Sequence, residues 1–166
     1  MSERTVVLDH VQVQRKLQRI AHQLHEENHA EKGIVLVGIA PRGMALARRL
    51  VTLLGPIADL EVELVELKLD KDRPLEAAVN LSVSLDVLRG RTVVLVDDVL
   101  MSGRTLMHAA AHLVTVPLKR LLTVVLVDRR HRSYPIRADI VGLTLSTTTQ
   151  EHISVELGSK DAVYLD

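Results

Sequence analysis

Three continuous apolar segments, each about as long as one β-strand, constrain the fold of this 166-residue chain more than any other feature. They span Ile34 to Gly38, Thr92 to Asp97 and Leu121 to Val127, and Val, Leu and Ile dominate all three. A strand with one face in water alternates apolar and polar residues, whereas a strand covered on both faces is apolar throughout. The segments therefore predict a parallel sheet with helices on both faces, which is an α/β fold.

Stretches with helical periodicity separate these strands. The first predicted helix runs to about Asn28 and begins at Asp9, which can cap it together with Gln12. Two more helices are expected at positions 44–54 and 103–115, and further strands at 60–64, 139–143 and 162–165. A long mobile loop is predicted at 69–82 and a polar loop at 146–150. Because no repeat, low-complexity tract or linker interrupts the pattern, we expect a single domain over residues 1–166.

The composition narrows the classes of function. Lys plus Arg and Asp plus Glu number 21 each, so the net charge gives no reason to expect binding to DNA or to a membrane. Cysteine is absent, which excludes disulfides and thiolate metal sites, and only Tyr134 and Tyr164 are aromatic. No long apolar run follows Met1, so we expect neither a signal peptide nor a transmembrane helix, and a cytoplasmic location.

The segment most informative about function follows the second apolar run. Two adjacent carboxylates, Asp97 and Asp98, end the strand Val93 to Val96, and the residues after them, through Thr105, open a helix. Ligands of parallel sheets lie beyond the carboxyl ends of the strands, and the N–H groups at a helix start bind anions. Two acids beside an anion cradle suit a ligand with vicinal hydroxyls near a phosphate, such as ribose 5-phosphate.

Other sites with similar residues fit the sequence less well. A receiver domain places its acidic pair after the first strand, whereas Asp97 and Asp98 lie past the middle of this chain. Neither the G-x-G-x-x-G dinucleotide fingerprint nor the G-x-x-x-x-G-K-[ST] phosphate loop is present. A solvated surface turn would account for two aspartates, but not for the whole string from Val93 to Thr105.

This string resembles the signature of type I phosphoribosyltransferases. Arg19 to His22, Val35 to Gly43, Val127 to Arg132 and Pro135 to Asp139 are similar to the bacterial pyrimidine operon attenuation and uracil phosphoribosyltransferase family. The similarity extends over nearly the whole chain and is most specific at the Asp-Asp turn and at 128–139. It implies the type I phosphoribosyltransferase fold, with a central parallel sheet flanked by helices and a mobile lid loop.

The resemblance also implies a reaction and a set of site residues. The family transfers ribose 5-phosphate from 5-phosphoribosyl-1-pyrophosphate to uracil, giving UMP. Asp97 and Asp98 would hold the ribose hydroxyls, Arg42 would hold pyrophosphate, and Mg²⁺ would bridge pyrophosphate and ribose near the two aspartates. Further substrate contacts are expected from Ala40, Pro41, Gly43, Val99, Leu100, Met101, Ser102, Gly103, Arg104, Thr105 and Asp128.

The lid and the nucleobase pocket depart from the family pattern. Positions 68–71 read Lys-Leu-Asp-Lys where the family has a Tyr-Arg-Asp-Asp-like string, so Lys71 or Arg73 would have to replace the arginine that reaches pyrophosphate. Ile140 and Leu143 occupy positions where the family has an aromatic residue and a lysine. Uracil is the expected base, and a purine is disfavoured because no aromatic ring near Ile140 can stack on it.

The family also regulates pyrimidine genes by binding a messenger RNA stem-loop through a basic dimer face. Cationic side chains available for phosphate contacts are Arg19, His22, Arg129, Arg132 and Arg137, although Gln18 replaces the threonine that the family prefers. The first interpretation is therefore an enzyme, and the alternative is a nucleotide-sensing, RNA-binding regulator with weak or no catalysis. For either, the family implies a homodimer or homotetramer.

Overall fold

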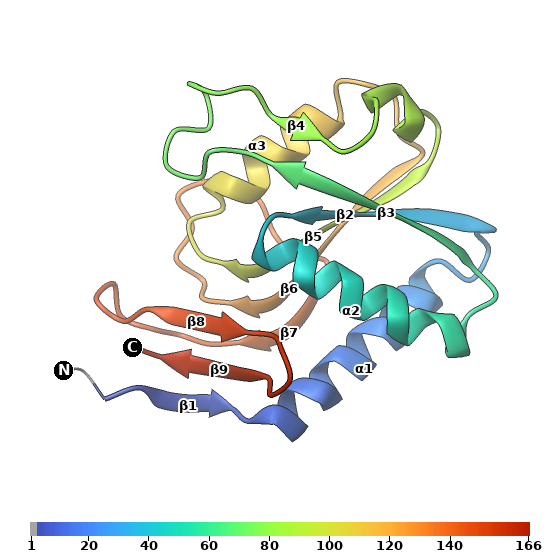
Figure 1. Ribbon diagram of the computed structural model, residues 1–166. Helices are drawn as coiled ribbons and strands as arrows, with labels where there is room; N and C mark the ends of the chain where they lie inside the picture. Colours follow the sequence, from blue (N-terminus) through green and yellow to red (C-terminus); the bar gives the residue numbers. More distant parts are fainter. Residues whose placement is uncertain (1–2) are drawn as a thin grey trace.

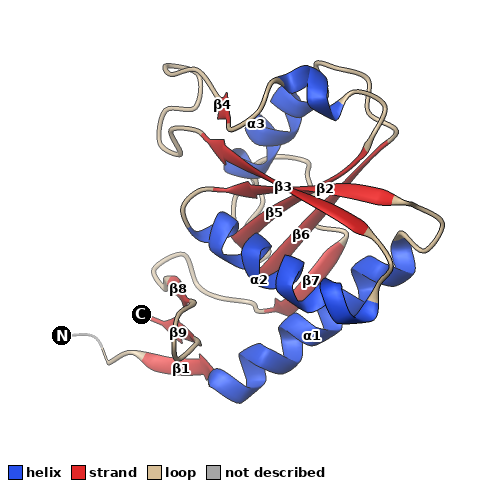
Figure 2. Cartoon of the chain, turned by 45° about the vertical axis from the view of Figure 1, so that its right-hand side comes forward, coloured by secondary structure: helices blue, strands red, loops and turns tan. Residues whose placement is uncertain are grey.

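The strands form two β-sheets in the computed structural model, which describes residues 3–166 (Figures 1 and 2). The larger sheet contains, in spatial order, β4 (Asn80–Leu81), β3 (Glu61–Lys68), β2 (Gly33–Ile39), β5 (Thr92–Leu100), β6 (Arg120–Asp128) and β7 (Ile140–Thr144). Every pair in it is parallel except β3 with β4. The α/β fold with a mostly parallel sheet, predicted from the apolar segments, is confirmed.

Helices α1 (His10–Glu27), α2 (Arg42–Ile57) and α3 (Arg104–Leu113) flank this sheet, and a short 3₁₀ helix spans Leu85–Leu88. Figure 1 shows α1 and α2 on one face and α3 on the other. Within residues 3–166, no helix has the length and apolar character that crossing a membrane would require.

The alternation of β2 shows why its residues are all apolar. Ile34 and Leu36 belong to the core that contains the buried faces of α1 and α2. Val35 and Val37 belong to the opposite core, together with Leu106 of α3. Because successive side chains of a strand point to opposite faces, two cores demand apolar residues at every position.

The capping signal at the start of α1 is confirmed. The Asp9 carboxylate accepts a hydrogen bond from the Gln12 backbone N–H at 2.8 Å, and the Gln12 side-chain oxygen accepts one from the Asp9 N–H at 2.9 Å. This reciprocal pair satisfies two N–H groups that a helix start would otherwise leave free. It also fixes where the chain leaves β1 and enters α1.

The smaller sheet has the order β1-β9-β8 and joins the two ends of the chain. It consists of β1 (Thr5–Leu8), β9 (Ala162–Leu165) and β8 (Ile153–Glu156), all paired antiparallel. The strand predicted at 162–165 exists, but it lies in this sheet and not in the parallel one. β1 and β8 were not predicted, and β4 lies inside the segment predicted as a loop at 69–82.

Candidate active site

Asp97 and Asp98 lie inside β5, because the strand continues to Leu100 instead of ending at the acidic pair as predicted. The two residues are only 4% and 5% exposed. Asp97 Oδ1 accepts a hydrogen bond from the Asp98 N–H at 2.9 Å, and Asp98 Oδ1 accepts one from the Val99 N–H at 2.8 Å. The backbone therefore fixes the direction of both carboxylates before any ligand binds.

Burial raises the pKa of Asp97 to about 8, and the neighbouring Asp98 carboxylate adds to this rise while Lys71 opposes it. The largest cause is the loss of water around the charged form. Two carboxylates this close resist carrying two negative charges, so the ligand-free pair retains a proton at neutral pH. Such perturbed acids are typical of functional sites.

The turn after β5 has a conformation that favours glycine. Gly103 has φ +85°, and a Cβ at this position would lie 2.7 Å from Ile136 Cγ2. The Ser102 carbonyl accepts hydrogen bonds from the N–H groups of Ser133 at 2.8 Å and Tyr134 at 3.0 Å. The segment that follows β6 therefore holds the turn in place at the start of α3.

The turn between β2 and α2 lies against the acidic strand. A Cβ at Gly43 would lie 2.5 Å from the Val96 carbonyl oxygen and 2.9 Å from Asp97 Cα. The Ala40 N–H donates to the Leu67 carbonyl at 2.8 Å, which ties the same turn to β3. This close approach brings Arg42, the first residue of α2, to the edge of the acidic site.

A cavity of about 360 Å³ lies at the carboxyl end of β5. Predicted site residues that line it are Arg42, Lys71, Asp97, Asp98, Val99, Leu100, Met101, Ser102, Gly103, Arg104 and Thr105. The fold therefore brings together the start of α2, the segment after β3 and the turn between β5 and α3. The acids Asp97 and Asp98, the turn at 101–105 and the cations Arg42, Lys71 and Arg104 therefore face one cavity.

Some predicted residues lie elsewhere. Arg73 pairs with Glu76 at 3.2 Å and is not among the cavity residues, so Lys71 is the lid cation at the site. The Asp128 carboxylate accepts hydrogen bonds from Arg132 Nη2 at 2.7 Å and from the Arg130 N–H at 2.9 Å, and it does not line the cavity. Ala40 and Gly43 do not line the cavity either; they pack the turn before α2 against β3 and β5. Pro41 lines a neighbouring cavity.

Arg129 corrects one expectation about the cationic surface. It is 3% exposed, and its guanidinium donates to Thr147 Oγ1 at 3.0 Å and to the carbonyl of Glu151. Burial lowers the pKa of Arg129, with the charge of Glu151 acting in the other direction. The prediction that Arg129 contacts RNA phosphates at the surface is therefore wrong, and Arg129 lines the cavity instead.

The other four side chains predicted to contact RNA phosphates differ in how strongly other residues of the chain hold them. Arg132 is held by Asp128 and by the carbonyls of Ile136 at 2.9 Å and Met101 at 2.8 Å. Arg19 is exposed, although its Nη2 donates to the carbonyl of Gly142 in β7 at 2.5 Å. The exposed residues His22 and Arg137 remain on the surface, and the Arg137 side chain is 90% exposed.

The structure adds site residues that the sequence reading missed. His152 and Ile153, at the start of β8, line the cavity from the smaller sheet. Arg104 Nη2 donates to the Lys71 carbonyl at 2.9 Å and so joins α3 to the lid. A signal for β8 was available, because Ile153 and Val155 alternate with Ser154 and Glu156.

The acidic pair fits one kind of metal binding. Among the described residues, no group of three or more His, Asp or Glu side chains could hold a metal ion. Mg²⁺ takes oxygen ligands and needs few from the protein when a polyphosphate supplies the others. Asp97 and Asp98 therefore fit Mg²⁺ that enters with a phosphorylated ligand.

The fold and the site together define the class of protein. The family model described as the phosphoribosyl transferase domain matches residues 4–161. Solved structures agree on the fold: a hypoxanthine phosphoribosyltransferase of Trypanosoma cruzi superposes with a TM-score of 0.77 at 17% identity, over 90% of this chain and 84% of its own. A hypoxanthine-guanine phosphoribosyltransferase of Bacillus anthracis gives 0.74 at 19% identity, over 88% and 85%.

Sequence relatives refine this class. The bifunctional protein PyrR of Brevibacillus brevis is 38% identical over 98% of this chain and 95% of its own length. The bifunctional protein PyrR of Clostridium novyi is also 38% identical, over 98% and 97%. The chain therefore belongs to the phosphoribosyltransferase family and, within it, to the PyrR group.

Proposed function

We propose that the chain transfers ribose 5-phosphate from 5-phosphoribosyl-1-pyrophosphate to uracil, with Mg²⁺ as cofactor. The observation that carries this proposal is the meeting of the Asp97–Asp98 pair with the turn at 101–105 in one cavity. The spacing suits a ribose whose hydroxyls lie on the acids and whose 5-phosphate lies at the start of α3. The relationship to PyrR proteins supports the choice of a pyrimidine base.

Each part of the donor meets protein groups of complementary chemistry. Asp97 and Asp98 accept hydrogen bonds from the two ribose hydroxyls, and the backbone N–H groups of the turn bind the 5-phosphate. Arg42 binds the pyrophosphate, and Lys71 binds it from the lid side. When Mg²⁺ is bound with the donor, it neutralises part of the pyrophosphate charge.

The reaction needs positioning more than a reactive side chain. The bond from C1 of the ribose to the pyrophosphate oxygen breaks, and its electron pair leaves with pyrophosphate. A bond forms from C1 to N1 of uracil, and the N1 proton passes to the departing pyrophosphate or to water. Positive charge develops on the ribose and negative charge on the leaving group, so Arg42 stabilises the departing anion. The segment at 69–82 closes over the cavity and keeps water from the ribose.

Two departures from the family pattern do not touch the proposed base pocket. Ile140 is 3% exposed and packs in the core with α1 and α2, and Leu143 packs against the same core. Neither lines the cavity. The base would instead meet Arg129, His152 and Ile153, which line the cavity beyond the acidic strand.

The test is the initial rate of UMP formation from uracil, donor and Mg²⁺, with other nucleobases assayed in parallel. We expect Asp98→Asn to lower the rate roughly 100-fold or more, because charge placed at the reacting ribose is lost. Asp86→Asn is the matched control, since Asp86 is a surface residue paired with Arg89 at 3.1 Å. Donor binding without turnover of any base would rule out the enzyme and favour a nucleotide sensor.

A second function, binding of an RNA stem-loop, is favoured by the exposed cations of α1 and of the segment before β7. Arg19 of α1 donates to the Val141 and Gly142 carbonyls of β7. His22 is exposed three residues further along α1, and Arg137 is exposed three residues before β7. We propose that these three side chains contact RNA phosphates. This surface does not include Arg129 or Arg132, whose guanidinium groups are held within the protein.

Gel-shift titration with a stem-loop from a pyrimidine gene leader tests this function at several salt concentrations. Replacing Arg137 with Ala should weaken binding. It should also reduce the slope of log affinity against log salt concentration by about one, which corresponds to the loss of one phosphate contact. Arg89→Ala, which removes an exposed arginine on another surface, should leave both unchanged. Equal effects of the two variants would show only a loss of general charge.

A further inference from the structure

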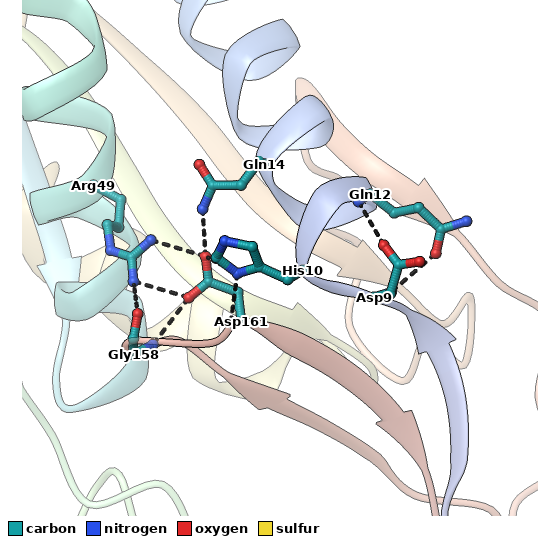
Figure 3. Close-up of polar contacts among 7 residues, drawn as sticks. All are labelled: Asp9, His10, Gln12, Gln14, Arg49, Gly158 and Asp161. Carbon is teal, nitrogen blue, oxygen red and sulfur yellow. Dashed lines mark hydrogen bonds and ion pairs between the residues drawn. The ribbon is translucent and has the colours of Figure 1, made fainter.

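A buried carboxylate outside both cavities joins three elements of the fold (Figure 3). Asp161 has no exposed surface and lies directly before β9. Its Oδ1 accepts hydrogen bonds from Arg49 Nη2 at 2.8 Å and the Gly158 N–H at 2.9 Å. Its Oδ2 accepts from Arg49 Nη1 at 2.9 Å and Gln14 Nε2 at 2.5 Å.

The same cluster holds its neighbours through the backbone. The Asp161 N–H donates to His10 Nδ1 at 2.9 Å, and Arg49 Nη2 also donates to the Gly158 carbonyl at 2.6 Å. α1, α2 and the turn between β8 and β9 therefore meet at one carboxylate, as Figure 3 shows. A buried charge is costly without partners, so this geometry permits little movement of the turn relative to α2.

The position of the cluster on α2 connects it to the donor site. Arg49 lies seven residues, or about two helical turns, after Arg42, so both side chains project from the same side of α2. Across a cavity of about 490 Å³, the turn residues Gly158, Ser159 and Lys160 lie opposite Pro41 and Arg42. The cluster fixes the distance between the pyrophosphate-binding turn and the smaller sheet.

A different residue anchors the other end of β8. Arg129 donates to Thr147 and to the carbonyls of Thr148 and Glu151, just before His152 and Ile153. Those two residues lie at the proposed base pocket, whereas Gly158 lies near Arg42. The smaller sheet thus has one polar anchor on the base side and another on the pyrophosphate side.

We propose that Arg49 and Asp161 are positioning residues for the pyrophosphate of the donor, acting through α2 and the turn between β8 and β9. This inference rests on the proposed transferase function and goes beyond it, because neither residue lines the cavity that holds the donor. It requires that loss of the Arg49–Asp161 pair weakens binding of the donor far more than binding of UMP. UMP occupies the same ribose and 5-phosphate positions but lacks pyrophosphate.

Calorimetric titration of the full chain tests the proposal, with 5-phosphoribosyl-1-pyrophosphate plus Mg²⁺ in one series and UMP in the other. We expect Asp161→Asn and Arg49→Gln each to weaken donor binding roughly tenfold, with UMP binding changed less than about twofold. Arg49→Lys keeps the charge but not the two-pronged geometry, so its loss should be intermediate. The double variant should lose no more than either single variant, because the two residues act as one unit.

Arg4→Gln is the control for general loosening of the smaller sheet. Arg4 pairs with Glu156 at 2.8 Å and Asp166 at 2.9 Å, so it holds this sheet together without touching α2. Equal weakening of donor and UMP in the Arg49 and Asp161 variants, or a donor-selective loss in Arg4→Gln, would overturn the proposal. If Asp161→Asn does not fold, Arg49→Lys decides by the same ratio, and a native chain that binds neither ligand would overturn the transferase function itself.

Discussion

Lys71 Nζ lies 3.9 Å from Asp97 Oδ1, and this ion pair connects the lid to the acidic strand. The Lys71 carbonyl also accepts a hydrogen bond from Arg104, so the lid is attached to α3 as well. Since burial and Asp98 raise the pKa of Asp97 to about 8 and Lys71 opposes the rise, the lid position and the protonation of Asp97 are coupled. Ribose hydroxyls and Mg²⁺ both favour the ionised carboxylate, which makes this coupling measurable.

Lys71→Met should move the pH dependence of donor binding upward. Without the lysine charge the pKa of Asp97 rises further, so the ionised pair that we propose as the ligand of Mg²⁺ and donor forms only at higher pH. We expect the midpoint of donor affinity between pH 6 and 9 to shift by up to about one unit, as measured by calorimetry. Lys71→Arg should preserve the midpoint, and so should Arg73→Met, which removes a cation paired with Glu76. An unchanged midpoint in Lys71→Met would show that the ion pair has no influence on Asp97.

Asp97→Asn should stabilise the ligand-free protein, increasingly as the pH rises. The folded pKa is about 8 and the unfolded pKa is near 3.8, so between these values the folded state binds the extra proton and native stability falls with rising pH. The amide resembles the protonated acid, and the variant escapes this loss. The gain in unfolding free energy should be near zero at pH 4 and on the order of 3 kcal/mol or more above pH 8. Urea denaturation at both pH values measures it, and a gain independent of pH would refute the raised pKa.

The sequence predicted the parallel sheet because its determinants are local. Each of the strands β2, β5 and β6 is covered on both faces, and this condition is visible as a continuous apolar run. The acidic pair and the turn at 101–105 were predictable for the same reason, since they are contiguous in the chain. Their convergence with Arg42 follows from the placement of β2 beside β5.

The smaller sheet was not predictable in the same way, because its strands are stabilised by distant partners. The segment at 162–165 was predicted as a strand, but its pairing with β1, in which Thr5 lies opposite Leu165, joins residues at the two ends of the chain and has no local signal. Arg129 illustrates the same limit for single side chains. It is buried beside Arg130, which is exposed, and nothing in the local sequence distinguishes the two arginines. Arg129 is buried because the distant segment that contains Thr147 and Glu151 accepts hydrogen bonds from its guanidinium group.

Gly43→Ala should damage the site through the backbone. The added methyl group would lie 2.5 Å from the Val96 carbonyl oxygen and 3.1 Å from Asp97 Oδ1, so α2 has to move away from β5. We expect a loss of about 1 to 3 kcal/mol in unfolding free energy and a loss of UMP formation larger than that instability explains. Gly55→Ala is the control within the same helix, since no atom lies within 4 Å of its added Cβ, and it should retain full activity. Rates measured well below the melting temperatures of the two variants separate loss of activity from loss of folding. Normal activity in Gly43→Ala would contradict the argument that the backbones approach closely at this position.

Gly103→Ala should lower affinity for the 5-phosphate, and Gly90→Ala provides the comparison. Both glycines have positive φ, +85° and +71°, so alanine at either position costs roughly 1 kcal/mol or more of backbone strain. Only Gly103 has a neighbour in the way, Ile136 Cγ2 at 2.7 Å, whereas the Cβ at Gly90 would meet nothing within 4 Å. UMP binding by calorimetry should therefore weaken in Gly103→Ala and remain unchanged in Gly90→Ala at similar loss of stability. Adding Ile136→Ala to Gly103→Ala removes the obstructing methyl group and should restore part of the affinity for UMP. A double variant that binds UMP as weakly as Gly103→Ala would show that backbone strain alone, and not the contact with Ile136, disturbs the turn.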